Sequence, residues 1–544
     1  MTAAPAPAPA RRSAPPSGAP VGVVGAGTMG AGIAQVAALA GHRVVLLDAA
    51  PGRAEAAVGQ VGRALQRLTE RGRLDPDRAV AAREALVAAR SVHDLAGCAL
   101  VVEAAVERLD VKRRLFATLE DVVAPSCVLA TNTSSLSVDD VAAGLRHPGR
   151  VVGMHFFNPA PVMRLVEVVQ GDATDPAVAA RVAEVARAWG KTPVRVASTP
   201  GFVVNRVARP FYGEALLALE DGLDAATVDA VLRGSGGFRM GPLELTDLIG
   251  QDVNLAATRS VWERLGPDAR YAPSPVQEAL VAAGSLGRKT GQGFFAHGDG
   301  ARDADQGPAP ATDAPGTPPA PEKVVVRGAW GPWTSLWQRA EEAGVAVLVD
   351  GALDRRPGPD GALGSATGGP PARVCEASAE LPGGLLVPTD GRTAADHAAA
   401  AGCPVVVLDL ALDAAAADRF AVAASPGCPR ELLDAAVGLL RATGAAVTVL
   451  PDRPGLLVAR TVAMLVDEAA VVVEAGVAAA ADVDVAMRLG AGYPLGPLEW
   501  GDRLGPARVA AVLDAVGAAT GDPRYRVSRT LRRAATTGGT LRDH

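Results

Sequence analysis

The segment Gly25-Ala26-Gly27-Thr28-Met29-Gly30 constrains the fold of this chain more than any other feature. It follows an apolar stretch, Val21–Val24, and precedes an Ala-rich helical stretch over residues 31–40. A second apolar stretch, residues 42–47, ends in Asp48. Strand, glycine turn, helix and strand in this order form a βαβ unit. Because the two strands of such a unit are parallel, the sequence predicts an α/β domain with a parallel sheet.

The glycines of this segment have the spacing GxGxxG, which suits a dinucleotide. Gly25 permits a tight turn, Gly27 lets the backbone approach a pyrophosphate, and Gly30 permits close packing of the helix on the strand. Thr28 and Met29 begin the helix, whose first N–H groups have no partner within it and can bind an anion. We therefore predict a Rossmann-type domain in which these five residues contact the cofactor.

Asp48 indicates which dinucleotide is bound. A carboxylate at the end of the second strand accepts hydrogen bonds from the ribose 2′-hydroxyl and repels a 2′-phosphate. The next two residues are Ala49 and Ala50, so no arginine follows directly to favour NADP. The sequence predicts NAD.

Composition excludes several other classes of protein. The chain has 544 residues, too many for one core, and its net charge of −6 gives no sign of a nucleic-acid partner. The five cysteines form no CxxC pair, which favours free thiols in a reducing cytosol over disulfides or a zinc site. No apolar run could span a membrane, and residues 1–20 lack the apolar core of a signal peptide. We expect a cytoplasmic protein with no metal and no membrane association.

Part of the sequence occurs twice. Gly241-Pro242-Leu243-Glu244 matches Gly496-Pro497-Leu498-Glu499, and Pro200-Gly201 matches Pro454-Gly455. The offset is 254 residues at the start of the repeat and 255 at its end. This regularity predicts two copies of one helical domain, whose alignment requires the insertion of a single residue in the second copy.

The chain is therefore expected to contain six segments. They are a disordered tail (1–20), a Rossmann NAD-binding domain (21–198), a helical C-terminal domain (199–297), a linker (298–322), a degenerate Rossmann-like domain (323–451) and a second all-α domain (452–544). Trp330 stands where the second glycine of a dinucleotide turn would be, and Ala459 stands at the position of Asn205. We expect one competent site per chain.

A second constellation of polar residues begins with His155-Phe156-Phe157-Asn158-Pro159, at the end of a predicted strand. Glu167 lies within the apolar stretch Leu165–Val169, where a buried acid needs a partner. A return from one strand to the next could pair it with His155. Such a pair fixes the imidazole tautomer and suits a general base, although a purely structural pair is an equal alternative.

Two further polar positions could contact a ligand. The run Thr131-Asn132-Thr133-Ser134-Ser135 follows an apolar strand, and its hydroxyls exceed what a helix cap at Ser137 requires. Asn205 lies early in the first helix after Pro200, where it could equally be an ordinary first-turn residue.

These motifs together resemble the L-3-hydroxyacyl-CoA dehydrogenase family. The resemblance covers residues 21 to about 296 and rests on VGAGTMGAGIA, ATNTSSL, GMHFFNPAPVMRLVEVV, TPGFVVNR, GPLELTDLIGQD and GRKTGQGFF. It implies NAD-dependent oxidation of (S)-3-hydroxyacyl-CoA to 3-oxoacyl-CoA, in fatty-acid or phenylacetate-type degradation.

The resemblance also implies roles for single residues. His155 would take the proton from the 3-hydroxyl, and Glu167 would orient His155. Ser134 and Asn205 would hydrogen-bond the substrate oxygen, and Asn158 would lie beside both nicotinamide and substrate. Further residues expected at the cofactor are Glu107, Lys112, Asn132, Ser134 and Lys289.

Arg63, Arg67 and Arg71 share one face of a predicted helix. In the family this region helps to hold CoA, so Arg67 and Arg71 are candidates for its phosphates. A solvated basic face is the alternative, which Glu70 and Asp75 favour because they dilute the charge.

Other readings of function stay open. The substrate could be short-chain or dicarboxylic, such as 3-hydroxybutyryl-CoA or 3-hydroxyadipyl-CoA. An NAD-dependent 3-hydroxy-acid or sugar-acid dehydrogenase of the same fold is a rival, and a non-catalytic NAD-binding scaffold is another. The second helical copy is expected to pack on the first as an intramolecular pseudo-dimer, with a homo-oligomer also possible.

Overall fold

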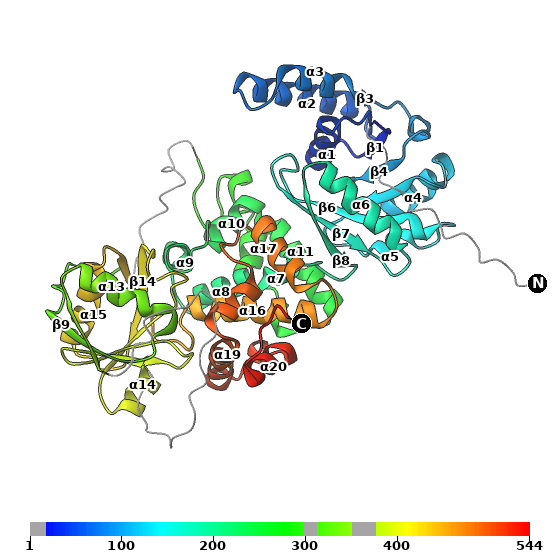
Figure 1. Cartoon of the computed structure of the whole chain (residues 1–544). Coiled ribbons are helices and arrows are strands. Elements are labelled where there is room, and N and C mark those ends of the chain that lie inside the picture. Colours follow the sequence, from blue (N-terminus) through cyan, green and yellow to red (C-terminus); the bar gives the residue numbers. More distant parts are fainter. Residues whose placement is uncertain (1–17, 299–312, 315, 351–376, 544) are drawn as a thin grey trace, which may run out of the picture. The chain divides into compact units, whose positions relative to one another are not determined.

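The computed structural model describes residues 18–298, 313–314, 316–350 and 377–543 (Figure 1). These residues form two compact units, each built from separate parts of the chain. Unit 1 contains the residues up to Val204 together with Gly476–Ala491, and unit 2 contains Asn205–Ala475 and the residues from Gly492 onward. Residues 1–17 of the predicted tail and residues 299–312 of the predicted linker lie outside the described residues.

Unit 1 contains a sheet of eight strands in the order β3-β2-β1-β4-β5-β6-β7-β8. Neighbouring strands are parallel except β6 and β7, which are antiparallel. The strands are β1 (Val21–Val24), β2 (Val44–Leu47), β3 (Leu86–Ala88), β4 (Leu100–Glu103), β5 (Val128–Thr131), β6 (Val151–Phe156), β7 (Leu165–Gln170) and β8 (Thr192–Ala197). The predicted Rossmann-type fold is confirmed.

Helices cover this sheet because its strands are apolar on both faces, and each face must be buried. Val23, Val102 and Met154 share a core with helices α1, α2, α3 and α6, whereas α5 contacts β6 and packs with α4. The helices are α1 (Thr28–Leu39), α2 (Arg53–Glu70), α3 (Pro76–Glu84), α4 (Leu109–Val122), α5 (Val138–Ala142), α6 (Pro176–Ala188) and α17 (Ala480–Gly490). The short helix α7 (Val204–Val207) crosses the boundary between the two units.

Helix α17 comes from the second helical copy yet packs within unit 1. It contacts β7 and β8, and the Ala197 amide donates to the Val477 carbonyl at 2.8 Å. The Arg195 amide donates to the Asp482 carboxylate at 3.2 Å. The second copy therefore supports the edge of the first sheet.

Unit 2 contains the rest of both helical copies. The first copy contributes α8 (Arg209–Glu220), α9 (Ala225–Gly234), α10 (Pro242–Ile249), α11 (Gln251–Leu265) and α12 (Pro275–Ala282). The second contributes α16 (Val458–Glu474), α18 (Pro497–Leu504), α19 (Pro506–Thr520) and α20 (Arg529–Thr537). The first helix expected after Pro200, over residues 206–221, is instead split at Ala208 into α7 and α8.

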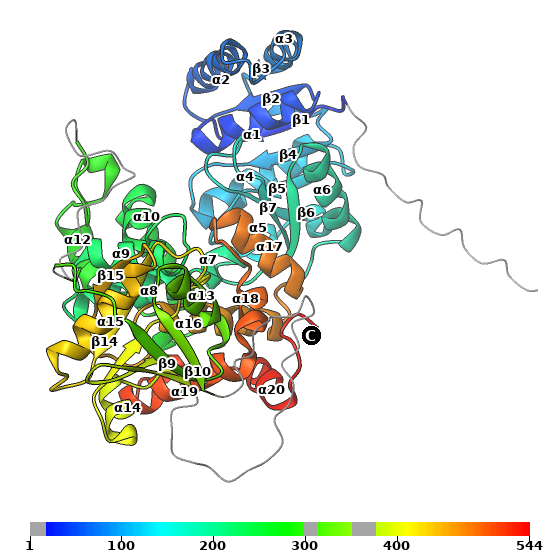
Figure 2. The same ribbon diagram turned by 60° about the vertical axis from the view of Figure 1, so that its left-hand side comes forward.

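The second α/β domain, also in unit 2, has a mixed sheet in the order β10-β9-β11-β12-β13-β14-β15. Its strands are β9 (Lys323–Gly328), β10 (Ala346–Asp350), β11 (Ala377–Leu381), β12 (Gly384–Pro388), β13 (Val405–Leu408), β14 (Arg419–Ala424) and β15 (Ala446–Val449). Its helices are α13 (Thr334–Glu342), α14 (Ala394–Ala401) and α15 (Arg430–Ala442), and α13 and α15 lie side by side on the sheet (Figures 1 and 2). Trp330, which replaces the glycine after β9, is fully buried.

Not all of residues 298–322 forms a free linker. Asp313 forms a β-bridge with Thr448 in β15, and the Ala314 amide donates to the Val447 carbonyl at 2.9 Å. The Asp313 carboxylate also pairs with Arg419. The end of the predicted linker is therefore attached to the second α/β domain.

The two helical copies contact each other through residues related by the repeat. Arg206 pairs with Glu468 at 2.9 Å, and Arg460, 254 residues after Arg206, pairs with Glu214 at 2.7 Å. The Tyr271 hydroxyl donates to Glu468 at 2.6 Å, and its equivalent Tyr525 donates to Glu214 at 3.1 Å. Each interaction thus occurs twice, as in a two-fold symmetric interface.

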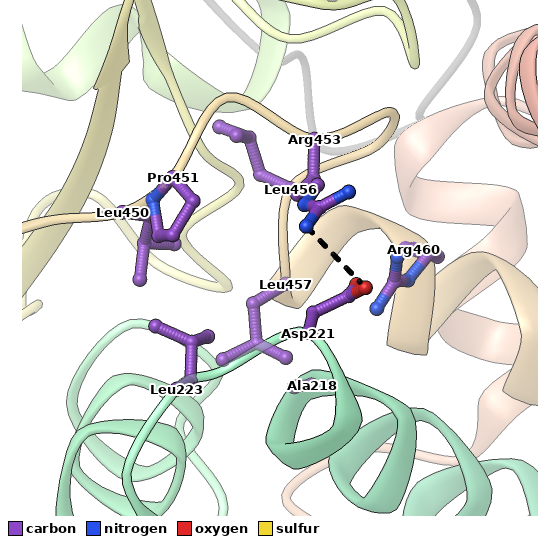
Figure 3. A pocket seen from close by; sticks show the side chains of 9 residues that line it. All are labelled: Ala218, Asp221, Leu223, Leu450, Pro451, Arg453, Leu456, Leu457 and Arg460. Atoms are coloured by element: carbon purple, nitrogen blue, oxygen red, sulfur yellow. Dashed lines mark ion pairs between the residues drawn. The ribbon is translucent and has the colours of Figure 1, made fainter.

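Figure 3 shows one edge of this contact, where a small cavity of about 20 Å³ lies between α8 and the start of α16. Leu223 from the first copy faces Leu450 and Leu457, and Asp221 pairs with Arg453 at 3.6 Å. A space of this size holds about one water molecule, so it is a packing defect and not a ligand site.

Within the described part of the chain, no helix is long and apolar enough to cross a membrane.

Candidate active site

Each glycine of the dinucleotide turn has its own structural reason. Gly25 has φ +102°, and a Cβ there would lie 2.4 Å from the Ala104 carbonyl oxygen. A Cβ at Gly30 would lie 1.7 Å from the Gly25 carbonyl oxygen. At Gly27 the nearest described atom is the Arg53 guanidinium, 3.8 Å away. Gly27 therefore leaves space for a ligand beside the turn, while the other two glycines serve the fold.

Helix α1 begins at Thr28, directly after this turn, and Thr28 and Met29 form its first turn. Gly27 provides no side-chain cap, and no acidic residue occupies the first turn. The free N–H groups and the positive end of the helix dipole thus suit a pyrophosphate.

Asp48 lies at the end of β2, beside the glycine turn. Its carboxylate accepts hydrogen bonds from the amides of Ala26 at 2.7 Å and Ala50 at 2.9 Å. Arg53 at the start of α2 lies 3.8 Å away and is 59% exposed. The carboxylate is therefore fixed next to the turn, as binding of an adenosine ribose requires.

The strand return brings His155 and Glu167 together. They are direct partners in the antiparallel register of β6 and β7, with 2.6 Å between His155 Nδ1 and Glu167 Oε2. Both side chains are buried. A carboxylate can only accept, so Nδ1 carries the proton and Nε2 is left as the basic nitrogen.

The second oxygen of Glu167 has a role that the sequence did not reveal. It accepts hydrogen bonds from the backbone amides of Val203 and Val204, each at 3.0 Å. Phe202, at φ +50°, turns the chain so that these two amides follow each other toward the carboxylate. The rings of Phe157 and Phe202 also lie 4.5 and 5.8 Å from the His155 ring. Glu167 thus joins the sheet, the histidine and the start of α7.

The run after β5 is organised by Glu107. Its Oε1 accepts from the Thr133 hydroxyl at 2.6 Å and from the amides of Ser134 and Ser135 at 2.9 and 3.1 Å. Burial alone would raise the pKa of Glu107, but the charge of Lys112 and these hydrogen bonds outweigh burial and lower the pKa. Ser134 is thereby held at the carboxyl end of the sheet.

Lys112, expected to contact the cofactor, lies beneath this run. Only 1% of its side chain is exposed, and its Nζ lies 2.6 Å from Glu103 and 3.2 Å from Glu107. The structure therefore gives Lys112 a supporting position, in which it acts on the surface through Glu107.

Two loops next to His155 are fixed by polar contacts. The side-chain oxygen of Asn132 accepts from the Phe156 amide at 2.8 Å, which ties the end of β5 to β6. The buried Nζ of Lys191 donates to the carbonyls of Ala160 and Met163 at 2.5 and 2.8 Å. This lysine was not singled out from the sequence. It anchors the loop that presents the exposed Asn158.

The remaining predicted residues come from other segments of the chain. Asn205 and Lys289 belong to unit 2, where Lys289 pairs with Asp252. Arg67 and Arg71 are exposed at the end of α2 and have no ion pair among the described residues. No group of three or more metal-binding side chains occurs in the described residues.

The second α/β domain shows what has replaced the histidine. The Asp409 amide donates to the Ala421 carbonyl at 2.9 Å, between the antiparallel strands β13 and β14. His155 and Glu167 face each other in the same way between β6 and β7, so Asp409 is the counterpart of His155. The Asp409 carboxylate accepts from the amides of Leu457 and Val458, which correspond to Val203 and Val204. This position now anchors α16 and has no base.

Three family matches cover most of the chain. Residues 20–199 match the NAD binding domain of 3-hydroxyacyl-CoA dehydrogenase, and residues 201–297 and 455–542 match the C-terminal domain of that family. Residues 386–454 match the reduced Rossmann-fold domain of 3-hydroxybutyryl-CoA dehydrogenase. With the dinucleotide turn and Asp48, these matches define an NAD-dependent dehydrogenase.

Individual relatives agree. A 3-hydroxyadipyl-CoA dehydrogenase of Escherichia coli (strain K12) is 40% identical over 518 residues, covering 95% of this chain and 97% of the relative. A 3-hydroxybutyryl-CoA dehydrogenase of Bradyrhizobium diazoefficiens is 40% identical over 276 residues, 51% of this chain and 94% of the relative. The crystal structure of 3-hydroxybutyryl-CoA dehydrogenase from Escherichia coli K12 has a TM-score of 0.79 at 39% identity, covering 95% of this chain and 98% of that one. The chain belongs to the 3-hydroxyacyl-CoA dehydrogenase family, and the predicted family, enzyme class and cofactor are confirmed.

Proposed function

We propose that the enzyme oxidises (S)-3-hydroxyacyl-CoA to 3-oxoacyl-CoA with His155 as the general base. The observation that carries this proposal is the 2.6 Å contact between His155 Nδ1 and Glu167. Bound NAD supplies the hydride acceptor. His155 Nε2 takes the proton of the 3-hydroxyl as the hydride leaves C3, and Glu167 stabilises the imidazolium that forms.

The other site residues bind and orient. Ser134 and Asn205 hydrogen-bond the substrate oxygen, and Asn158 lies beside the substrate and the nicotinamide. The cofactor contacts we propose are Gly25, Gly27, Thr28, Met29, Gly30, Asp48, Glu107, Asn132, Ser134 and Lys289, with Lys112 acting through Glu107. Arg67 and Arg71 are proposed to meet the CoA phosphates, where exposed guanidinium groups cost no desolvation.

The second half of the chain is proposed to replace a partner subunit. The paired contacts of Arg206 with Glu468 and of Arg460 with Glu214 support an isologous arrangement within one chain. The packing of α17 on β7 and β8 supports it further. Deletion of residues 298–544 followed by gel filtration tests this: a truncated enzyme that stays a soluble, active monomer would refute the proposal.

The location and pathway belong to the same proposal: a cytoplasmic enzyme of fatty-acid or phenylacetate-type degradation. The test is to follow NADH formation or consumption with a panel of 3-hydroxyacyl-CoA and 3-oxoacyl-CoA thioesters. Turnover of free 3-hydroxy acids or sugar acids instead would establish the rival dehydrogenase. NAD binding without turnover of any substrate would establish a scaffold.

A further inference from the structure

An arginine in the first helical copy is buried without a counter-ion. Arg209 is 5% exposed, at the start of α8, one helical turn after Asn205. No carboxylate lies within 4.0 Å of its guanidinium among the described residues, and burial lowers its pKa. An arginine remains charged even so, and a buried charge without a partner of opposite sign costs several kcal/mol.

The partners that Arg209 does have are neutral. Its Nε donates to the Asn205 carbonyl at 2.7 Å, and its Nη1 donates to the Thr258 hydroxyl at 2.7 Å and the Asn254 carbonyl at 3.4 Å. The ring of Tyr212 lies 4.8 Å from the guanidinium carbon. In the described part of the chain no atom accepts a hydrogen bond from Nη2, so this nitrogen is available to an anion.

A second unpartnered group faces the same region. Tyr493, from the second helical copy, is 5% exposed, and its buried hydroxyl has no hydrogen-bond partner among the described residues. Its ring packs against Phe211 at 5.5 Å, and Phe211 packs in turn against Tyr212, whose ring lies beneath the Arg209 guanidinium. A buried hydroxyl without a partner is as costly as a lost hydrogen bond. Arg209 Nη2 and the Tyr493 hydroxyl are thus two donors without an acceptor, and because the first is cationic, an anionic acceptor would suit both.

The second helical copy provides an internal comparison. The second copy has the same helices but no active site. There, the positions of Arg209, Asn254 and Thr258 are occupied by the apolar residues Ala463, Val509 and Leu513. Two more buried members of the cluster, Gln251 and Gln277, which hydrogen-bond each other at 2.9 Å, correspond to Pro506 and Leu531. The helical fold therefore does not need this polar cluster. It is retained only in the copy that carries Asn205.

We propose that Arg209, with the Tyr493 hydroxyl, binds a carboxylate at the far end of the acyl chain. The preferred substrate is then a 3-hydroxyacyl-CoA whose acyl group is a dicarboxylic acid. This inference rests on the proposed function, because it takes Asn205 as the contact to the substrate oxygen. The carboxylate supplies the counter-ion that Arg209 lacks, and a methyl-terminated chain would leave that charge unpaired.

The experiment compares two six-carbon substrates on the full-length enzyme, 3-hydroxyadipyl-CoA and 3-hydroxyhexanoyl-CoA. The wild-type enzyme should favour the first in kcat/KM by about 100-fold, because a charged hydrogen-bonded pair is made with only one of them. Arg209→Met should reduce this ratio about 100-fold, and Arg209→Lys should restore part of it. The triple variant Arg209→Ala, Asn254→Val and Thr258→Leu carries the residues of the second helical copy at these positions. Because that copy folds with them, the variant should fold, and its ratio of kcat/KM for the two substrates should fall as in Arg209→Met.

The matched control is Arg339→Met. Arg339 also donates to carbonyl oxygens, of Ala414, Ala417 and Thr443, and lies 5.6 Å from the Phe420 ring. It belongs to the second α/β domain, so its loss should leave the substrate ratio unchanged. A wild-type enzyme without preference, or Arg209 variants that slow both substrates equally, would overturn the inference while leaving the proposed function intact. Turnover of neither substrate would instead refute the proposed function.

Discussion

Replacing Glu167 by glutamine should abolish most of the activity while keeping the fold. The reason lies in how the two carboxylate oxygens are used. Oε1 accepts from the amides of Val203 and Val204, and Oε2 accepts from His155. In Glu167→Gln, the amide oxygen must stay on the two backbone amides, since an NH₂ group there would face two donors. The NH₂ group therefore faces His155 Nδ1.

This arrangement forces the wrong histidine tautomer. Nδ1 must accept from the glutamine NH₂, so the proton moves to Nε2, and Nε2 can no longer take the proton of the substrate hydroxyl. Loss of a general base lowers kcat by about 10²- to 10⁴-fold, and the developing imidazolium also loses its carboxylate. Because the backbone amides keep their acceptor, the loss of folding free energy should be only about 1–2 kcal/mol.

Glu167→Ala is the comparison variant. It leaves the Val203 and Val204 amides and His155 Nδ1 without an acceptor, which costs about 1–3 kcal/mol for each buried group. It should therefore lower both kcat and the melting temperature, whereas Glu167→Gln lowers mainly kcat. The assays are NADH formation at saturating substrate and thermal unfolding of the same samples. A Glu167→Gln enzyme that keeps more than about a tenth of wild-type kcat would refute the tautomer argument, since the expected loss is at least 10²-fold.

Three further predictions concern the support around the site. Gly490→Val should lower kcat without touching the site, because a Cβ at Gly490 would lie 2.6 Å from Leu165 and 2.9 Å from Val204; unchanged kinetics would contradict the supporting role of α17. Glu468→Ala removes the acceptor of two arginines and a tyrosine, and should cost about 3–5 kcal/mol in thermal or urea unfolding. The pKa of Glu107 is lowered, so its stabilising effect on the serine loop is complete above its unfolded pKa and is lost as the pH falls through the lower folded value. Amide exchange of that loop, corrected for intrinsic rates, should then be steady from neutral pH to about 4.5 and accelerate below, whereas Glu107→Gln should show no such step.

The sequence was informative wherever local pattern and chemistry coincide. β1 was predicted to its ends, because the apolar run Val21–Val24 is bounded by Pro20 and Gly25. The His155–Glu167 pair followed from a buried acid in an apolar strand. β3 was missed since it has only three residues and exposes Val87. β11 and β14 are rich in Ala, and β12 has only three apolar residues between Gly384 and Pro388, so these strands give no strong strand signal.

Other parts of the site depend on contacts that no local pattern contains. The hydrogen bonds of Val203 and Val204 to Glu167 join backbone groups to a side chain 36 and 37 residues away. Backbone amides carry no residue-specific signal, so only the folded chain shows them. The burial of Lys112 likewise depends on Glu103, one strand away from the loop it supports. A charged residue in a motif therefore need not lie at the surface that binds the ligand.

The two halves of the chain separate what the fold needs from what the chemistry needs. Phe202 and Leu456 share a positive φ, and in both halves a carboxylate accepts from the two amides that follow. In the first half that carboxylate lies on β7 and leaves the β6 position to His155. In the second half it has moved to the β6 position itself, as Asp409. The anchor of the helical domain has been kept at the expense of the base, which is the outcome expected where folding is still required and proton transfer is not.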